Sequence, residues 1–399
     1  MRDKSLALLF LMALTVLPMR FFAQDGLTLA WPDESCARIS LRSYTGLDLV
    51  AVDTLTKDAN GLFTYGPTLP LGMYVVGCDQ AEMEFLSMGK PLTLFVDDPE
   101  DAFAVRFASS PENTRWMAYQ RIREAFFRGE MDELSARHQI DSLVADTLDY
   151  AARLMLADSH PEWQATDFQD PDLIPTNVLT TKMVRFLERS GDDFIKGVDE
   201  VLQRAKVNMT SYEFALRYLL KGFTAMGLSE VTDHLLNFPQ LSEGEITEAE
   251  GNRLVALTEP YQKVRVGAKA PDYRGVTIDG EPYDLYESQA RRILLVFWSV
   301  DCEYCHDFLV QIRKHLNLRK DYELVTFALA DDRDEVCREV RRMRLRGRHF
   351  YDEARWEGKA FLDYHVVSTP MVLLLNEDKT IVCKPYQWED LEHYLELNP

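Results

Sequence analysis

The spacing of apolar residues changes twice along the chain and divides it into three regions. From residue 25 to about 108, short runs rich in β-branched and aromatic residues alternate with turn-forming segments such as "KDANG" at 57–61. Runs of this kind are typical of antiparallel strands, and several in succession predict a small β sandwich or barrel. Cys36 and Cys78 lie here, and the sequence leaves open whether they form a disulfide or stay buried free thiols.

From residue 110 to about 260 the apolar residues recur every three or four positions. Trp116, Tyr119, Ile122 and Phe126 show this spacing, which is that of an amphipathic helix. Further stretches of the same kind follow. We therefore expect an all-α middle domain whose aromatic and leucine side chains form its core.

From residue 265 to 399, strand-length and helix-length segments alternate. The run "RRILLVFWSV" at 291–300 is continuously apolar after its two arginines, which is typical of a strand buried on both faces of a sheet. Alternation of strands and helices predicts an α/β layer fold. The chain as a whole is therefore predicted to be multidomain, with a β-rich, an all-α and an α/β domain in that order.

The first residues have the pattern of an export signal. Arg2 and Lys4 precede an apolar run at 6–17, which has the length of a signal-peptide core and is short for a membrane span. We expect a signal peptide over 1–23, cleaved after Ala23, and an exported protein of the periplasm or cell envelope. An uncleaved membrane anchor is the alternative.

The distribution of charge along the chain argues against nucleic acid as a partner and reveals one cluster of arginines. The formal net charge of -21 would repel a phosphate backbone, so nucleic acid is not expected as a partner. The C-terminal region nevertheless holds a cluster of six arginines: Arg338, Arg341, Arg342, Arg344, Arg346 and Arg348. We expect them to form a solvated face that pairs with the acidic helical domain; a docking patch for an acidic redox partner is the alternative.

The segment "DCEYCH" at 301–306 carries the clearest candidate chemistry. Cys302, Cys305 and His306 fit a redox dithiol, half of a zinc site or a c-type haem attachment site. The motif follows a buried strand and opens a helix, whose N-terminus favours a thiolate. A haem site needs a small helical domain instead, and zinc needs a second close pair, whereas Cys337 and Cys383 stand alone. The position therefore favours a dithiol.

Two segments of the C-terminal region resemble a known family. "LLVFWSVDCEYC" at 294–305 resembles the strand and Cys-x-x-Cys of the thioredoxin superfamily, and "VSTPMVLLLN" at 367–376 resembles its cis-proline segment. The hairpin-like opening at 266–285 resembles the TlpA/ResA-like and peroxiredoxin-like branches. The long stretch between the two motifs resembles the extra helical insertion of the TlpA/ResA-like branch. The order of the three regions also resembles exported bacterial TlpA-like proteins.

This resemblance implies roles for individual residues. Cys302 would be the attacking thiol, Cys305 the resolving thiol and Pro370 the cis-proline that shapes the substrate groove. The backbone of Thr369 would pair with a bound peptide, and Trp298 would pack beside the site. One position departs from the family, because Val296 stands where thioredoxins often carry a buried acid. The proton acceptor for Cys305 is therefore left open.

The residues around the dithiol bear on the direction of electron flow. Glu303 and Tyr304 separate the cysteines, and Asp301 precedes them. Negative charge disfavours the thiolate of Cys302 and makes the couple more reducing. A protonated His306 would act in the opposite sense, unless it points to solvent and does little. The balance favours a reductase.

The sequence thus predicts a thiol–disulfide oxidoreductase that acts on protein disulfides in the cell envelope. It would need no cofactor or metal beyond the redox-active Cys302–Cys305 disulfide, and a thiol protein in the membrane would supply electrons. Two alternatives stay open. One is a peroxiredoxin-like peroxidase, although "FWSVD" lacks the Pro and Thr that precede a peroxidatic cysteine; the other is a binding protein with a vestigial redox domain. The role of 25–260 and the oligomeric state are not predicted.

Overall fold

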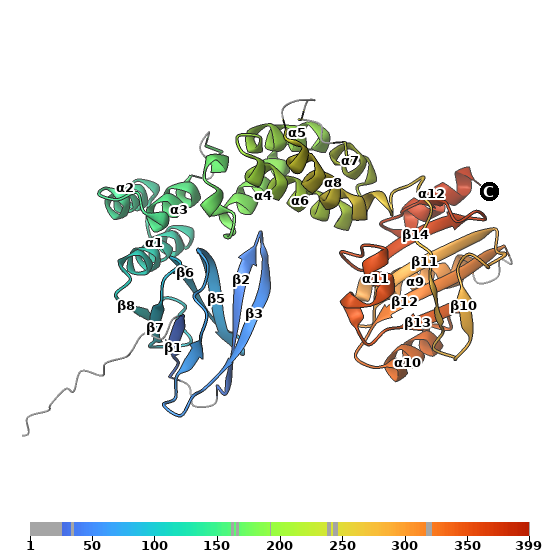
Figure 1. Cartoon of the computed structure of the whole chain (residues 1–399), viewed down its shortest axis with the longest axis horizontal. Helices are drawn as coiled ribbons and strands as arrows, with labels where there is room; N and C mark the ends of the chain where they lie inside the picture. Colours follow the sequence, from blue (N-terminus) through green and yellow to red (C-terminus); the bar gives the residue numbers. More distant parts are fainter. Residues whose placement is uncertain are drawn as a thin grey trace, which may run out of the picture. The chain divides into compact units, whose positions relative to one another are not determined.

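The computed structural model describes residues 26–32, 36–160, 163–164, 167–191, 193–237, 241, 246–316 and 321–398. The signal peptide expected over 1–23 lies outside them. Contacts divide the chain into two compact units, one up to Ser159 together with Pro175–Asn177, the other made of His160–Ile174 and the chain from Val178 onward. Figure 1 labels helices and strands of both units.

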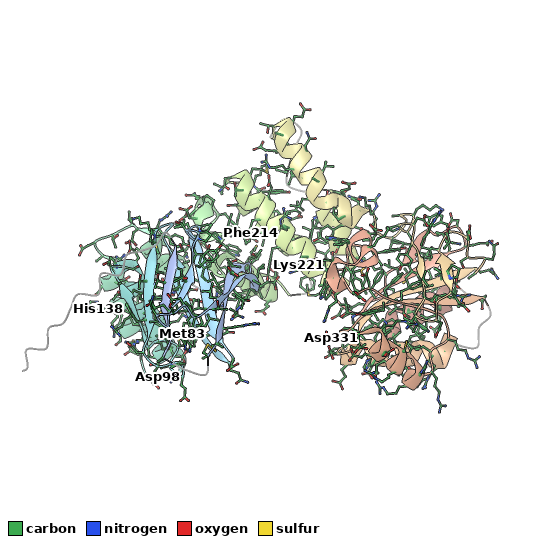
Figure 2. All side chains as sticks on the ribbon, turned by 60° about the horizontal axis from the view of Figure 1, so that its bottom comes forward. Met83, Asp98, His138, Phe214, Lys221 and Asp331 are labelled. Atoms are coloured by element: carbon green, nitrogen blue, oxygen red, sulfur yellow. A yellow bond between two sulfur atoms is a disulfide. The ribbon has the colours of Figure 1, made fainter. Side chains whose placement is uncertain are left out.

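The first unit contains a β sandwich, as the sequence predicts. Its two four-stranded sheets have the orders β4-β1-β7-β8 and β3-β2-β5-β6. Leu29 and Phe63 of one sheet share a core with Ile39 and Met83 of the other, and Met83 lies among the strands of this sandwich (Figure 2). All pairings are antiparallel except that of β1 with β7. The strands are β1 (Leu27–Ala30), β2 (Arg38–Thr45), β3 (Asp48–Thr56), β4 (Phe63–Tyr65), β5 (Gly72–Cys78), β6 (Ala81–Ser87), β7 (Leu92–Val96) and β8 (Val105–Ala108).

A disulfide joins Cys36 to Cys78, which resolves the question that the sequence leaves open. Cys36 is 1% exposed and belongs to the core of the sandwich. Cys78 ends strand β5. The bond therefore ties the segment before β2 to the far end of β5.

Helix α1 (Pro111–Phe127) packs against this sandwich, and α2 (Glu133–Val144) and α3 (Tyr150–Ser159) pack against α1. Ser110 caps α1 by accepting a hydrogen bond from the N–H of Asn113. The buried side chain of Asn113 exchanges two 2.8 Å hydrogen bonds with the N–H and C=O of Leu86, on the edge strand β6. Trp116 and Gln120 donate to the carboxylate of Glu84 on the same strand. The change from strands to helices expected near residue 110 is present, but it falls inside one compact unit.

The second unit begins with the other helices of the middle region: α4 (Val178–Arg189), α5 (Phe194–Ala205), α6 (Met209–Ala225), α7 (Ser229–Leu235) and α8 (Glu248–Gln262), with the short 3-10 turns η1 (Asp167–Gln169) and η2 (Pro171–Leu173). These helices touch the C-terminal domain of the same unit. The rings of Tyr261 and His365 lie 4.2 Å apart. Gly227 has a φ of +68°, and a Cβ at this position would lie 2.4 Å from Cβ of Tyr386, so the contact requires glycine.

The C-terminal domain is an α/β layer fold, as predicted. Its sheet has the order β13-β12-β11-β14-β15, with β11 in the centre (Figure 1). Strand β11 pairs parallel with β12 and antiparallel with β14. The elements are β9 (Arg274–Val276), β10 (Pro282–Asp284), β11 (Arg292–Ser299), α9 (Glu303–Leu316), β12 (Tyr322–Leu329), α10 (Arg333–Met343), β13 (Arg348–Tyr351), η3 (Arg355–Glu357), α11 (Lys359–Asp363), β14 (Met371–Asn376), β15 (Ile381–Cys383) and α12 (Trp388–Leu397).

Strand β11 is buried on both faces because alternate side chains enter two different cores. Leu294 and Trp298 pack with residues of α9, α10 and α12 on one face. Ile293 and Phe297 pack with residues of β12, β13 and α11 on the other. The insertion expected between the dithiol and the cis-proline is helix α10 and strand β13, which pairs parallel with β12. The fold thus holds the end of β11 rigidly, and the dithiol follows it.

Candidate active site at the dithiol

The dithiol lies in the turn between β11 and α9. Strand β11 ends at Ser299 and helix α9 begins at Glu303. The N–H of Cys302 donates to the carbonyl oxygen of Ser299 at 3.2 Å, and the N–H of His306 donates to the carbonyl oxygen of Cys302 at 3.2 Å. These bonds place Cys302 directly before the first helical turn, as the sequence predicts.

The two cysteines form a disulfide with Cα atoms 5.2 Å apart, and their environments differ. Cys305 is fully buried and belongs to the core beneath α9, whereas Cys302 packs at its edge and is partly exposed. The N–H of Cys305 points at Sγ of Cys302, 3.1 Å away. In the reduced state this N–H and the helix N-terminus would stabilise a thiolate at Cys302. The geometry therefore leaves Cys302 as the accessible sulfur of the pair.

The predicted cis-proline is confirmed, since the Thr369–Pro370 peptide bond is cis. The pairing of Met371 with Phe297 places this bond beside the end of β11. The carbonyl oxygen of Thr369 lies 3.8 Å from Sγ of Cys302. Cys302 and Thr369, which are 67 positions apart in the sequence, are thus brought together by the pairing of β14 with β11.

Trp298 and Val296 occupy the same face of β11 as the core that holds Cys305. Both side chains are fully buried there. Nε1 of Trp298 has no hydrogen-bond partner among the described residues. Because Val296 is surrounded by apolar side chains, this position supplies no proton acceptor to Cys305.

His306 does not point into solvent, and its partners come from the insertion helix α10. Its Nε2 is 3.8 Å from Oε2 of Glu339, and its Nδ1 is 3.4 Å from a guanidinium nitrogen of Arg342. Its ring lies 5.9 Å from that of Trp298. Arg342 and Glu339 also pair with each other at 2.6 Å. The sequence analysis does not identify Glu339, since neither spacing nor motif connects α10 with the dithiol.

The other residues of the active-site turn are exposed. Asp301 and Glu303 present their carboxylates to solvent, and Tyr304, between the cysteines, is 82% exposed. An exposed aromatic ring at this position provides an apolar surface beside the accessible sulfur. The negative charges expected near Cys302 are therefore in place.

The expectation for the arginine cluster is only partly met. Arg342 pairs with Glu339 of its own helix, and Arg348 pairs with Glu281 of the β9–β10 hairpin. These partners lie inside the C-terminal domain, whereas pairs with the helical region were expected. The sequence could not distinguish the two, because both regions are rich in acids.

The alternative chemistries of the motif find little support in the geometry. Among the described residues no group of three or more His, Cys, Asp or Glu side chains could hold a metal ion. Cys337 and Cys383 are free thiols that do not join the dithiol. A c-type haem site would need a helical domain around the motif, whereas here the motif lies between a strand and a helix of an α/β domain.

The fold and this site together define a thioredoxin-like domain, and comparison with known proteins agrees. Residues 282–385 match the family model of a thioredoxin-like domain. No curated protein matches the chain. No helix in the described part of the chain is long and apolar enough to cross a membrane.

Solved structures similar to this chain are distant in sequence. The C-terminal domain of a putative thiol-disulfide oxidoreductase from Bacteroides thetaiotaomicron is 20% identical, with a TM-score of 0.32, over 34% of this chain and 96% of that one. A thioredoxin-like protein from Bacteroides caccae is 18% identical, with a TM-score of 0.43, over 64% and 96%. A thiol-disulfide oxidoreductase from Bacteroides fragilis is 19% identical, with a TM-score of 0.30, over 33% and 99%.

Proposed function

We propose that the C-terminal domain catalyses thiol–disulfide exchange with protein disulfides of the cell envelope, in the reducing direction. One observation carries the proposal. The partly exposed Cys302 lies at a helix N-terminus, bonded to a fully buried Cys305 and 3.8 Å from the carbonyl oxygen of Thr369. This arrangement supplies an attacking sulfur, a resolving sulfur and a backbone acceptor for a bound peptide.

The reaction consists of two exchanges. In the reduced enzyme the thiolate of Cys302 attacks one sulfur of the substrate disulfide, and the other substrate sulfur leaves as a thiolate that takes up a proton. The thiol of Cys305 then loses its proton and attacks Sγ of Cys302. This step releases the second substrate thiol and forms the Cys302–Cys305 disulfide, so two electrons have passed to the substrate.

The reducing direction rests on the charges of the active-site turn. Asp301 and Glu303 disfavour a thiolate at Cys302, and a less stabilised reduced form belongs to a more reducing couple. The apolar run at 6–17 supports export. Regeneration would then need a thiol protein at the membrane as electron donor, with no cofactor bound to this chain.

The decisive experiment is the reduction potential of the Cys302–Cys305 couple in the purified chain from residue 24. Equilibration against glutathione or dithiothreitol, with alkylated peptides counted by mass spectrometry, separates this pair from Cys36–Cys78. A potential of about -250 mV or lower supports a reductase, and one near about -120 mV indicates an oxidant. If no reversible Cys302–Cys305 disulfide forms, the enzymatic proposal is wrong and a binding role takes its place.

A further inference from the structure

A groove lies on the C-terminal domain between helix α10 and the turn of the β9–β10 hairpin; we refer to it as the α10 groove. It consists of two adjoining hollows of about 430 and 300 Å³, which share Ile278, Asp279, Cys337 and Arg341 as lining residues. The guanidinium of Arg333 donates to the carbonyl oxygen of Ile278 and so ties the hairpin to the helix. The groove is therefore a formed feature of the domain.

The walls of the α10 groove carry more positive than negative charge. Arg338, Arg341 and Arg346 are exposed, and none of them forms an ion pair with a described residue. Arg333 and Arg344 add two further guanidiniums, while Asp279 contributes a carboxylate to both hollows and Asp334 contributes one to the larger hollow. In a protein with a net charge of -21, such a local excess of cations creates a potential that attracts small anions.

One buried polar group opens onto the inner end of the groove. His349 is 4% exposed and lines the smaller hollow. Its Nδ1 lies 2.8 Å from the hydroxyl of Thr326, and its Nε2 has no hydrogen-bond partner in the described structure. Burial lowers the pKa of His349 to about 4, against smaller opposing effects of the Leu345 carbonyl and Asp279. The ring is therefore neutral near pH 7, and an occupant of the groove can complete its hydrogen bonding.

Cys337 gives the α10 groove a nucleophile. It is a half-buried free thiol that lines both hollows. Cys383, also free and half-buried, lies in a different setting, where burial and the charge of Asp390 raise its pKa to about 11. The two thiols therefore lie in different surroundings, because arginines line the hollows around Cys337 whereas the carboxylate of Asp390 acts on Cys383, and they should differ in reactivity towards charged disulfides.

We propose that the α10 groove binds small disulfides that carry carboxylates, and that Cys337 exchanges with them. The thiolate of Cys337 attacks one sulfur of the bound disulfide, whose S–S bond breaks. A mixed disulfide forms on Cys337, and the other half of the small molecule leaves as a thiolate. The arginines bind the carboxylates. This modification site is independent of the Cys302–Cys305 couple and does not rest on its proposed function.

The test compares an anionic with a cationic disulfide on the full chain carrying Cys302→Ser and Cys305→Ser. Oxidised glutathione is the anionic probe and cystamine the cationic one. Peptide mass spectrometry follows Cys337 and Cys383 in the same sample, and Cys383 provides the internal reference. We expect the rate of modification of Cys337 to saturate as the concentration of glutathione disulfide rises. Divided by the rate at Cys383 with the same probe, the rate at Cys337 should be greater with glutathione disulfide than with cystamine by about tenfold or more.

Two pairs of substitutions then locate the effect. Arg338→Gln with Arg341→Gln should remove both the saturation and the preference for the anionic probe. Lys263→Gln with Lys359→Gln is the matched control, because it removes two exposed cations whose partners Glu259 and Asp363 lie on their own helices. A rate that rises linearly with probe concentration, equal corrected rates for the two probes, or a preference that survives the arginine substitutions would overturn the proposal.

Discussion

Nε2 of His306 lies 3.8 Å from Oε2 of Glu339, so the residue after the dithiol is paired with the insertion helix α10. The imidazole is enclosed between this carboxylate, the guanidinium of Arg342 and the ring of Trp298. A helix that is remote in the sequence therefore places a carboxylate and a guanidinium next to the residue that follows the dithiol. This relationship can be tested through the redox couple.

Replacing Glu339 by Gln should make the couple less reducing. The substitution removes a negative charge and leaves the positive charge of Arg342 beside the active-site turn, which stabilises a thiolate at Cys302. We expect the reduction potential to rise by about 10 to 30 mV, which corresponds to roughly 0.5 to 1.4 kcal/mol for a two-electron couple. Glu353→Gln, an exposed acid outside the site, is the control. An unchanged potential in Glu339→Gln would show that the pair has no influence on the dithiol.

The two cysteines should behave differently when each is replaced. Cys305→Ser should accumulate a mixed disulfide between Cys302 and a protein substrate, because the resolving thiol is missing. Cys302→Ser should accumulate little, since Cys305 is fully buried. Non-reducing gels and mass spectrometry of the captured species measure both. Equal trapping by the two variants would contradict the assignment of Cys302 as the attacking thiol.

Asn113→Ala should loosen the β sandwich from helix α1. The asparagine is the partner of both polar backbone groups of Leu86 on the outer side of β6, and its loss leaves two buried groups unsatisfied. We expect a loss of about 3 kcal/mol in stability, read as faster hydrogen–deuterium exchange in peptides of β6 and a lower urea midpoint. Asn60→Ala, at an exposed turn, should change neither. Similar exchange in both variants would show that the bridge contributes little.

Lys384 should make the stability of the second unit depend on pH. Burial lowers its pKa to about 8 from 10.5, with Asp233 opposing the shift. Between these two pH values the unfolded chain binds more protons at this residue than the folded chain does. The contribution of Lys384 to the free energy of unfolding therefore rises as the pH goes from about 8 to 10.5. Lys384→Met should therefore be more stable than the wild type at pH 7, by up to about 3 kcal/mol.

The measurement that isolates this residue is the difference between wild type and Lys384→Met in urea unfolding at several pH values. That difference should shrink as the pH rises through the window, because the wild-type lysine then loses its charge. Tyrosines that titrate in the same range cancel in the difference. A difference that stays constant from pH 7 to 10 would contradict the lowered pKa.

The sequence predicts those parts of the structure whose causes are local. The buried strand and the dithiol at the helix start each follow from a short run of residues, and the cis bond before Pro370 is implied by the resemblance of one short segment to the thioredoxin superfamily. Glu339 next to His306 escapes prediction, because only the packing of α10 against α9 brings them together. The hydrogen bonds between Asn113 and Leu86 escape prediction for a similar reason. They join helix α1 to the sandwich across the point in the sequence at which the apolar spacing changes. The pairing of Cys36 with Cys78 follows only from the arrangement of the strands, which the sequence pattern does not determine.

The Cys36–Cys78 bond also has a meaning for a molecule that would reduce disulfides. Such a protein carries a possible target within its own chain and would be inactivated if it treated that target as it treats others. Cys36 is almost completely enclosed by the sandwich core, so attack at this sulfur requires the sandwich to open first. Folding thus shields one of the two sulfurs of this bond, while Cys78 is only partly buried. Under the proposed function, the same criterion would separate substrates from properly folded proteins, because a disulfide could be reduced only while one of its sulfurs can be reached.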